Sequence, residues 1–297
     1  MNADLVGRVV LVTGAARGIG AHTARLAAAR GARLALIGLE QDRLAALAAE
    51  LGEGHAWAEC DVTDQVGLER AVRYAADTLG GIDIVLANAG VASYGTVEVT
   101  PVEALARTIE VNLLGVVRTV STTLPYLARR RGYYLLVSSA AAFTALPGMA
   151  AYCASKAGIE QFANALRLEV AYRGIGVGTA HPAWIDTDLV RDARRDLPTF
   201  GDTLRRLPWP VGSVAPVDRC ARALVDGMAR RRRRIYVPGA IGLVQALRTV
   251  VLGPVGEAVL RGGARTSVPA LESEARALGR SFGEHSAGGS APDRNSP

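Results

Sequence analysis

The sequence predicts an α/β fold: a single Rossmann-like, doubly wound domain with a seven-stranded parallel sheet and helices on both faces. Short, almost wholly apolar runs alternate with longer helical patterns along most of the chain. Such runs are typical of parallel strands, which helices cover on both sides. The first run leads into a glycine-rich turn and then into a helical pattern. Right-handed crossovers between parallel strands then produce the doubly wound topology.

Each apolar run is an expected strand, and the stretches between the runs are expected helices. The strands are expected at residues 8–13, 33–38, 55–60, 82–87, 133–138, 175–180 and 234–238. The helices are expected at residues 18–30, 41–51, 64–79, 101–130 and 216–230, with another around AYCASK at 151–156. Residues 183–215 break the rhythm with three prolines and two tryptophans, which predicts a long loop over the carboxyl edge of the sheet.

The chain is expected to divide into three parts. Residues 1–240 would form the Rossmann-fold domain, and residues 241–280 a C-terminal helical extension. Residues 281–297 are small, polar and rich in glycine and proline, which predicts a disordered tail. The amphipathic segment 239–260 either packs on its own domain or a partner subunit, or lies on a membrane surface.

The charge is concentrated in one place. The formal net charge is +6, and five positive charges come from the arginine run at residues 230–234. The rest of the chain is nearly neutral, which argues against the spread basic surface of a nucleic-acid-binding protein. The run is expected to be a solvated helix end, with contact to an acidic partner or lipid headgroups as the alternative. The sequence contains no run of about 20 apolar residues that is free of charge, so we expect no membrane-spanning helix.

Cysteine and histidine give no sign of a metal site. The three cysteines lie far apart, and the four histidines form no pair at metal-binding spacing. An odd number of scattered cysteines favours a reducing, intracellular compartment. The first residues lead directly into an expected strand, so we expect no signal peptide and a cytoplasmic location.

A glycine-rich turn follows the first expected strand. The stretch TGAARGIG at residues 13–20 ends that strand and opens a helix. Gly14, Gly18 and Gly20 permit a tight turn and a close approach of the backbone to a ligand. The N-terminus of the following helix offers free N–H groups and a positive dipole to a pyrophosphate. This strand–turn–helix context predicts a nucleotide site.

Lys156 is the only lysine of the chain. The other thirty-three of the thirty-four basic residues are arginine. It follows Tyr152 by four residues on an expected helix, so the two side chains share one face. Lysine carries a compact charge on a slim stem, whereas the guanidinium of arginine is a broad fork. An ammonium beside a phenol favours the phenolate and lowers its pKa from about 10. The pair predicts a proton-transferring tyrosine, with an exposed helix face as the alternative.

Several motifs, taken in order, resemble the short-chain dehydrogenase/reductase family over about residues 5–240. The spacing GxxxGxG after a threonine is that family's form of the glycine turn, and NAG at 88–90 follows the fourth expected strand. Asp61 and Val62 match its adenine-contacting pair. One departure is Ala183 after Pro182, where the family has glycine, and this puts only the local loop shape in doubt.

The resemblance also implies the roles of individual residues. The implied catalytic residues are Asn112, Ser139, Tyr152 and Lys156. Ser139 would hold the substrate oxygen, and Asn112 would hold a water that links Lys156 to solvent. The implied cofactor contacts are Gly14, Arg17, Gly18, Ile19, Gly20, Glu40, Asp61, Val62, Asn88, Ala89, Gly90, Tyr152, Lys156, Pro182, Ile185 and Thr187.

The end of the second strand bears on the choice between NAD and NADP. Gly38 stands where NAD-preferring relatives usually have aspartate, and Leu39 where NADP-preferring relatives usually have arginine. Arg17 and Arg43 could meet a 2′-phosphate, whereas Glu40 would repel it. The expected cofactor is therefore NAD or NADP, with a preference for NAD.

The resemblance implies an NAD(P)-dependent oxidoreductase that interconverts a secondary alcohol and a ketone, with Tyr152 as general acid and base. It also implies a homodimer or homotetramer acting on a small molecule. Apolar stretches at 91–94, 143–149 and 183–215 favour a hydrophobic substrate. The alternative is a nucleotide-sensing or scaffold protein that kept the fold without turnover.

Overall fold

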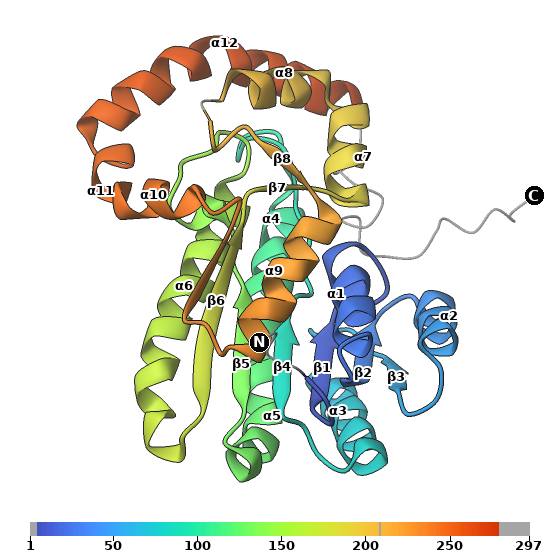
Figure 1. The fold of residues 1–297 in the computed structure, drawn as a ribbon. Coiled ribbons are helices and arrows are strands. Elements are labelled where there is room, and N and C mark those ends of the chain that lie inside the picture. Colours follow the sequence, from blue (N-terminus) through green and yellow to red (C-terminus); the bar gives the residue numbers. More distant parts are fainter. Residues whose placement is uncertain (1–4, 208, 279–297) are drawn as a thin grey trace, which may run out of the picture.

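The structure is a computed structural model that describes residues 5–207 and 209–278. Its centre is a parallel sheet of seven strands in the order β3-β2-β1-β4-β5-β6-β9, which confirms the predicted fold class (Figure 1). The strands are β1 (Val9–Thr13), β2 (Arg33–Gly38), β3 (Ala56–Glu59), β4 (Ile84–Ala87), β5 (Tyr133–Val137), β6 (Gly176–Pro182) and β9 (Arg234–Val237). The predicted tail at 281–297 lies outside the described residues.

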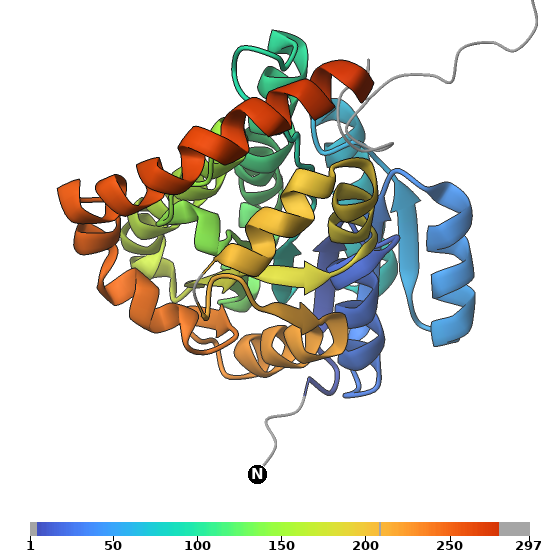
Figure 2. The same ribbon diagram turned by 90° about the horizontal axis from the view of Figure 1, so that it is seen from above.

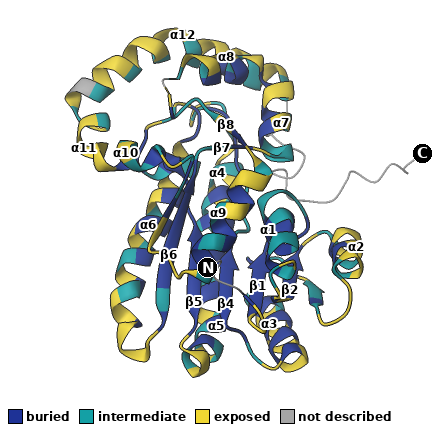
Figure 3. Ribbon diagram, in the orientation of Figure 1, coloured by how far each residue is buried: buried dark blue, intermediate teal, exposed yellow. Residues whose placement is uncertain are grey.

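Helices cover both faces of the sheet, because side chains alternate along each strand. In β1, Val10 and Val12 belong to one core cluster, and Val9 and Leu11 to the other. Figure 3 shows the strands buried and the outer faces of the helices exposed. The first cluster includes residues of α1 (Gly18–Ala28), α2 (Gln41–Leu51) and α9 (Val217–Ala229), and the second includes residues of α3 (Gln65–Leu79), α5 (Gly115–Arg130) and α6 (Ala150–Glu169).

The single helix expected at 101–130 is interrupted. It consists of α4 (Val102–Ile109), a π-helical turn η1 (Glu110–Leu114) and α5. The turn is closed by a hydrogen bond from the Gly115 N–H to the Glu110 carbonyl, five residues back. Such turns occur mostly at functional sites, and this one contains Asn112.

The prediction of a long loop at 183–215 is wrong, because this segment folds into regular elements. It holds β7 (Trp184–Asp186), α7 (Asp188–Asp196), α8 (Pro198–Arg206) and β8 (Val214–Pro216), with β7 and β8 paired as a small parallel sheet. Pro198 occupies the first turn of α8, where a missing N–H costs nothing. Each helix is only nine residues long, so its apolar period was too short to stand out.

The C-terminal segment is helical and lies over the carboxyl ends of the strands. It comprises α10 (Ile241–Ala246), α11 (Arg248–Val251) and α12 (Pro254–Leu278). Figure 2, seen from above, shows α12 running across this end of the molecule near α7 and α8. Within residues 5–207 and 209–278, no helix is long and apolar enough to cross a membrane.

The arginine run at 230–234 begins at the end of α9 and reaches the first residue of β9. It is exposed, as expected of a solvated helix end. Arg231 is nevertheless tied to the protein, since its guanidinium donates hydrogen bonds to the carbonyl oxygens of Gly132 at 2.6 Å and Gly174 at 3.0 Å. This end of the sheet lies opposite the C-terminal helices (Figure 1).

Candidate active site

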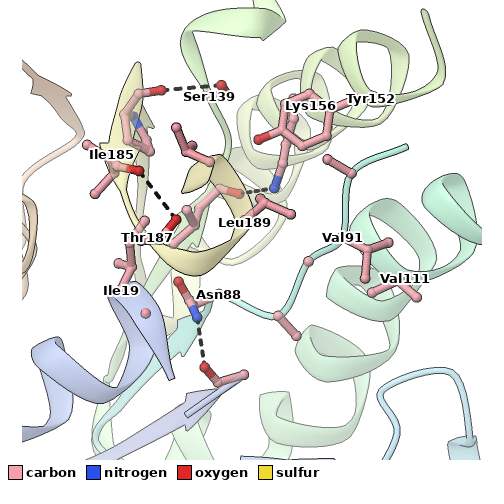
Figure 4. Close-up of a pocket in the computed structure, with 18 of the residues that line it drawn as sticks. Ile19, Asn88, Val91, Val111, Ser139, Tyr152, Lys156, Ile185, Thr187 and Leu189 are labelled. Atoms are coloured by element: carbon pink, nitrogen blue, oxygen red, sulfur yellow. Dashed lines mark hydrogen bonds between the residues drawn. The ribbon is translucent and has the colours of Figure 1, made fainter. Parts of the chain in front are cut away.

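A cavity of about 410 Å³ opens at the carboxyl ends of the strands. Ligands of doubly wound sheets bind at this edge, where the strand order reverses. Here the chain runs from β1 outward to β2 and β3 and returns to β4 on the other side of β1. Figure 4 shows side chains from several elements meeting in the cavity, among them Ile19, Asn88, Tyr152, Lys156 and Leu189.

The glycine turn between β1 and α1 forms one wall. Gly14 has a φ of +65°, and a Cβ there would lie 2.8 Å from the Ala89 Cα. Gly20 does not line the cavity, but a Cβ there would lie 2.1 Å from the Gly14 carbonyl oxygen. Only residues without a side chain permit this close packing. The turn is thereby held against the segment after β4, and Gly14, Gly18 and Ile19 line the cavity at the N-terminus of α1.

Two ion pairs lie among the side chains that line the cavity. Arg17 Nε lies 2.9 Å from Glu40 Oε1, and Arg107 Nη2 lies 2.7 Å from Asp61 Oδ2. Burial alone would raise the pKa of Asp61, but hydrogen bonds from Arg107 and Thr63 outweigh burial and hold this pKa below its usual value. Asp61 is therefore a fixed carboxylate at neutral pH.

Asn88 joins the ends of β4 and β1. Its backbone N–H donates to the Thr13 hydroxyl at 3.0 Å, and its amide nitrogen donates to the Thr13 and Gly14 carbonyl oxygens at 3.1 and 3.2 Å. These bonds fix the segment through Gly90 against the glycine turn. The motifs at residues 13–20 and 88–90, predicted separately from the sequence, thus form one continuous wall.

Tyr152 and Lys156 project from the same side of α6 toward the end of β5 that carries Ser139 (Figure 4). Lys156 Nζ lies 5.5 Å from the centroid of the Tyr152 ring and donates a hydrogen bond to the Val137 carbonyl oxygen at 2.9 Å. Ser139 Oγ donates to the Pro182 carbonyl oxygen at 3.2 Å. The three side chains line the same cavity.

The pKa of Tyr152 moves in the opposite direction from the one predicted. Burial raises it to about 12, and a hydrogen bond with Ser139 opposes the rise only in part. Burial also lowers the pKa of Lys156 to about 8. Desolvation disfavours both charged forms, and here it outweighs the attraction of an ammonium for a phenolate. At neutral pH Tyr152 therefore keeps its proton.

Asn112 lies directly behind this site and is fully buried. Its Oδ1 accepts from the Val91 N–H at 2.8 Å, and its Nδ2 donates to the Val91 carbonyl at 2.9 Å and to Ser155 Oγ at 3.2 Å. The side-chain amide is thus committed to the backbone after β4 and to α6. This arrangement fixes the position of Gly90, where a Cβ would lie 3.6 Å from Lys156 Nζ.

The segment after β6 closes the cavity on another side. Pro182, Ile185 and Thr187 all line it, and the Thr187 hydroxyl donates to the Ile185 carbonyl oxygen at 3.3 Å. A Cβ on Gly18 would lie 3.5 Å from the Thr187 methyl group, so this segment reaches across to the glycine turn. Ala183, which stands where the family has glycine, does not separate this segment from the glycine turn.

The structure gathers almost all of the sequence-predicted site residues around one cavity. Each of them lines it except Gly20 and Asn112, which pack immediately behind its wall. Sequence reasoning missed Arg107, Val111 and Leu189, which also line the cavity. Arg107 carries no local signal, because its partner Asp61 is forty-six residues away. Among the described residues, no group of His, Cys, Asp and Glu could hold a metal ion.

Comparison with known proteins agrees with this geometry. Residues 8–198 match the short chain dehydrogenase family. D-threitol dehydrogenase of Mycolicibacterium smegmatis is 36% identical over 225 residues, which cover 74% of this chain and 85% of that protein. Glycine betaine reductase ATRR of Emericella nidulans is 37% identical over 213 residues, which cover 70% of this chain but only 16% of that protein.

A solved structure shares the fold. The crystal structure of gox2181 superposes with a TM-score of 0.70 at 26% identity, covering 77% of this chain and 90% of that one. The match to the family spans both the glycine turn and the Ser139, Tyr152 and Lys156 site. The chain belongs to the short-chain dehydrogenase family of oxidoreductases.

Proposed function

We propose that the protein is an NAD(P)-dependent oxidoreductase that interconverts a secondary alcohol and a ketone of a hydrophobic substrate. One observation carries the proposal: Ser139, Tyr152 and Lys156 line a single cavity beside the glycine turn. A nucleotide wall and a proton-transferring group in one cavity are what a hydride-transfer enzyme requires.

The residues divide the work of reduction between them. Ser139 donates a hydrogen bond to the ketone oxygen and orients it toward Tyr152. Tyr152 then transfers its phenolic proton to that oxygen, and its raised pKa of about 12 means that the proton is present at neutral pH. Lys156 supplies a compact positive charge 5.5 Å from the ring centroid, which stabilises the phenolate left behind. The nicotinamide, when bound, supplies the hydride in this direction and accepts it in the other.

The residues present fit such a cofactor. Gly14, Gly18 and Ile19 line the cavity at the N-terminus of α1, where free N–H groups can bind a pyrophosphate. Asp61, Val62, Ile185 and Thr187 line the same cavity. Asn112 acts as a positioning residue for the segment around Gly90, through its bonds to Val91.

The ion pair between Arg17 and Glu40 favours NAD over NADP. Glu40 offers a carboxylate that can accept hydrogen bonds from ribose hydroxyl groups. A 2′-phosphate would meet the negative charge of Glu40, while Arg17 is already engaged by Glu40 at 2.9 Å. We therefore assign NAD as the preferred cofactor.

The competing hypothesis is a protein that senses nucleotides without turnover. The complete set of Ser139, Tyr152 and Lys156 favours the enzyme, because sensing alone requires no proton donor. The test is nicotinamide absorbance, followed with NADH and NADPH and a panel of hydrophobic ketones, and with NAD and NADP and the matching alcohols. Turnover of at least one pair supports the enzyme. Tight nucleotide binding without turnover across the panel would support the sensor instead.

A further inference from the structure

Three aromatic side chains form one wall of the cavity beyond Tyr152. Phe200 stands between the other two, with ring centroids 4.6 Å from Tyr94 and 5.2 Å from Trp184. The rings meet edge to face, with interplanar angles of 68° and 70°. They come from the segment after β4, from β7 and from α8, and all three line the cavity. We call Tyr94, Trp184 and Phe200 the aromatic wall.

The surroundings of the aromatic wall are apolar as well. The same apolar cluster contains residues of the segment after β4, of the segment before α6 and of α7, and these also line the cavity. They are Ala92, Leu146, Met149, Leu189, Val190 and Ala193. Burial also raises the pKa of Tyr94, so its phenol adds no charge at neutral pH. A substrate in this part of the cavity is therefore surrounded by hydrocarbon and rings on several sides.

Each charged side chain that lines the cavity is engaged by another group in the described part of the chain. Arg17 is paired with Glu40, and Arg107 with Asp61. Asp188 is paired with Arg191 at 2.8 Å on α7. Lys156 donates to the Val137 carbonyl beside Tyr152. Lys156 thus bonds to a neutral carbonyl, and its charge lies beside the Tyr152 ring. The arginines that line the cavity are already paired with carboxylates, so a carboxylate or phosphate on the substrate would meet no unpaired arginine there, and burying such a group unpaired is unfavourable.

The polar groups near Tyr152 match a single oxygen. Tyr152 can donate to a ketone oxygen, and Ser139 can do so when its hydroxyl turns away from the Pro182 carbonyl, to which it donates at 3.2 Å. The Thr144 hydroxyl donates to the Ala140 carbonyl at 3.1 Å. A sugar ketone would bring further hydroxyl groups against the apolar lining, where each loses its bonds to water. The lining thus disfavours polyols, which are the substrates named for the related D-threitol dehydrogenase.

The aromatic wall is held in place from outside the cavity. Leu271 of α12 is buried in the same cluster, and the Glu274 carboxylate accepts from the Thr199 N–H at 3.1 Å, next to Phe200. Glu272 accepts a hydrogen bond from Thr96 at 2.8 Å, close to Tyr94. A wall fixed from behind in this way offers a preformed surface, which favours rigid ligands that lose little conformational freedom on binding.

We infer that the substrate is a neutral, apolar ketone or secondary alcohol that carries a ring, and that the ring packs on Tyr94, Trp184 and Phe200. This inference rests on the proposed function for its chemistry, but the binding preference can be measured without turnover. A ring presents a flat or rigid face to the edges and faces of the aromatic wall. A linear chain of equal carbon number loses rotational freedom when it is held there.

The test compares three neutral ketones. They are 2-decalone, which has rings, 2-decanone, which has the same number of carbons in a chain, and erythrulose, a small sugar ketone. Binding of each ketone to the wild-type protein is measured by calorimetry with saturating oxidised cofactor, which has no hydride to give a ketone, and kcat/KM is measured separately with reduced cofactor. We expect 2-decalone to bind at least about tenfold more tightly than 2-decanone, with erythrulose the weakest. Equal or tighter binding of 2-decanone or erythrulose would overturn the inference.

Measuring ketone binding and turnover separately distinguishes the inference about the ligand from the proposed function. If 2-decalone binds most tightly but no ketone is turned over, the proposed function fails and the inference about the ligand stands. If erythrulose is bound and turned over best, the proposed function stands and the inference fails.

Variants of the aromatic wall locate the preference. Trp184→Leu and Phe200→Leu keep apolar surface but remove a ring, so each should weaken 2-decalone binding by about tenfold and 2-decanone binding by less. Trp184 is only partly buried, so its variant tests the wall even where the loss of the buried Phe200 ring impairs folding. Trp209→Leu is the matched control, since Trp209 is 75% exposed and does not line this cavity. Unchanged 2-decalone binding in the Trp184 variant would contradict the inference.

Discussion

Lys156 shows what a single residue type contributes to this site. Its side chain passes between α6 and the end of β5, and it is 4% exposed. The Nζ atom donates to the Val137 carbonyl at 2.9 Å, and a Cβ on Gly90 would lie 3.6 Å from it. A guanidinium is broader than an ammonium and would not fit between these backbone segments without displacing one of them. The one lysine in an arginine-rich chain therefore lies where arginine would be excluded.

The titration of Lys156 should be visible in the rate of ketone reduction. Because burial lowers its pKa to about 8, the ammonium loses its proton as the pH rises through that value. The rate should then fall about tenfold per pH unit above this point. Lys156→Arg should be at least about 100-fold slower at neutral pH, and should lack this decline because its charge persists. Profiles of kcat against pH for both proteins provide the measurement. A fully active arginine variant would contradict the account.

Glu40 should control the choice of cofactor. Glu40→Gln removes the carboxylate that engages Arg17 and would repel a 2′-phosphate. We expect kcat/KM with NADPH to rise about tenfold and kcat/KM with NADH to fall. Glu53→Gln, at an exposed glutamate away from the cavity, is the control and should change neither. A wild-type protein that already prefers NADPH would show that the assignment of NAD is wrong.

Some residues of the site could be predicted from the sequence, and others could not. Tyr152 and Lys156 were predictable because helical geometry alone places residues four apart on one face. Arg107 was not, because its bond to Asp61 depends on how α4 lies over the sheet. The direction of the Tyr152 pKa was mispredicted, because spacing reveals the neighbouring charge but not the extent of burial.

At the scale of elements, α10 is joined by a buried hydrogen bond to α6, the helix that carries Tyr152 and Lys156. Gln245 Nε2 donates to Glu160 Oε1 at 2.7 Å, and Glu160 lies one turn beyond Lys156. Gln245 also bonds to the Tyr236 hydroxyl of β9. The exposed Arg248 lies 3.7 Å from the Glu160 carboxylate, a longer contact. The C-terminal helices thus satisfy a carboxylate that is 5% exposed within the Rossmann domain.

Gln245→Leu should therefore destabilise the whole domain. It leaves Glu160 without its closest partner, which should lower the free energy of unfolding by about 1–3 kcal/mol. Gln161→Leu on the exposed face of α6 is the control and should stay within about 0.5 kcal/mol of wild type. Urea unfolding of the three proteins provides the comparison. An unchanged stability in Gln245→Leu would mean that α10 contributes little to holding the domain together.

The reliability of prediction differed between kinds of element. The strands were predictable because most of them are short apolar runs, and β1 and β5 are buried along their full length. The π-helical turn at Glu110–Leu114 was not, because its sequence has the same apolar period as the helices on either side. The helices α7 and α8 were missed because their buried faces are completed by distant residues such as Leu271 and Met149.

At the scale of the whole molecule, the two ends of the sheet have different roles. The cavity lies at the carboxyl ends of the strands, where α7, α8 and α12 gather above it (Figure 1). The seven-stranded, doubly wound parallel sheet could be predicted because the alternation of strands and helices allows few topologies. The shape of the cavity could not, because it depends on contacts between segments after β4, after β6 and at the C-terminus.

The central claim is that Tyr152 transfers a proton to the substrate oxygen in a nicotinamide-dependent reaction. The most direct test compares the wild-type protein with Tyr152→Phe, which removes the hydroxyl and keeps the ring. The measurement is kcat for ketone reduction at saturating cofactor, together with the cofactor dissociation constant and the melting temperature. We predict a fall in kcat of at least about 100-fold with the other two quantities nearly unchanged. A variant that turns over substrate at close to the wild-type rate would contradict the account.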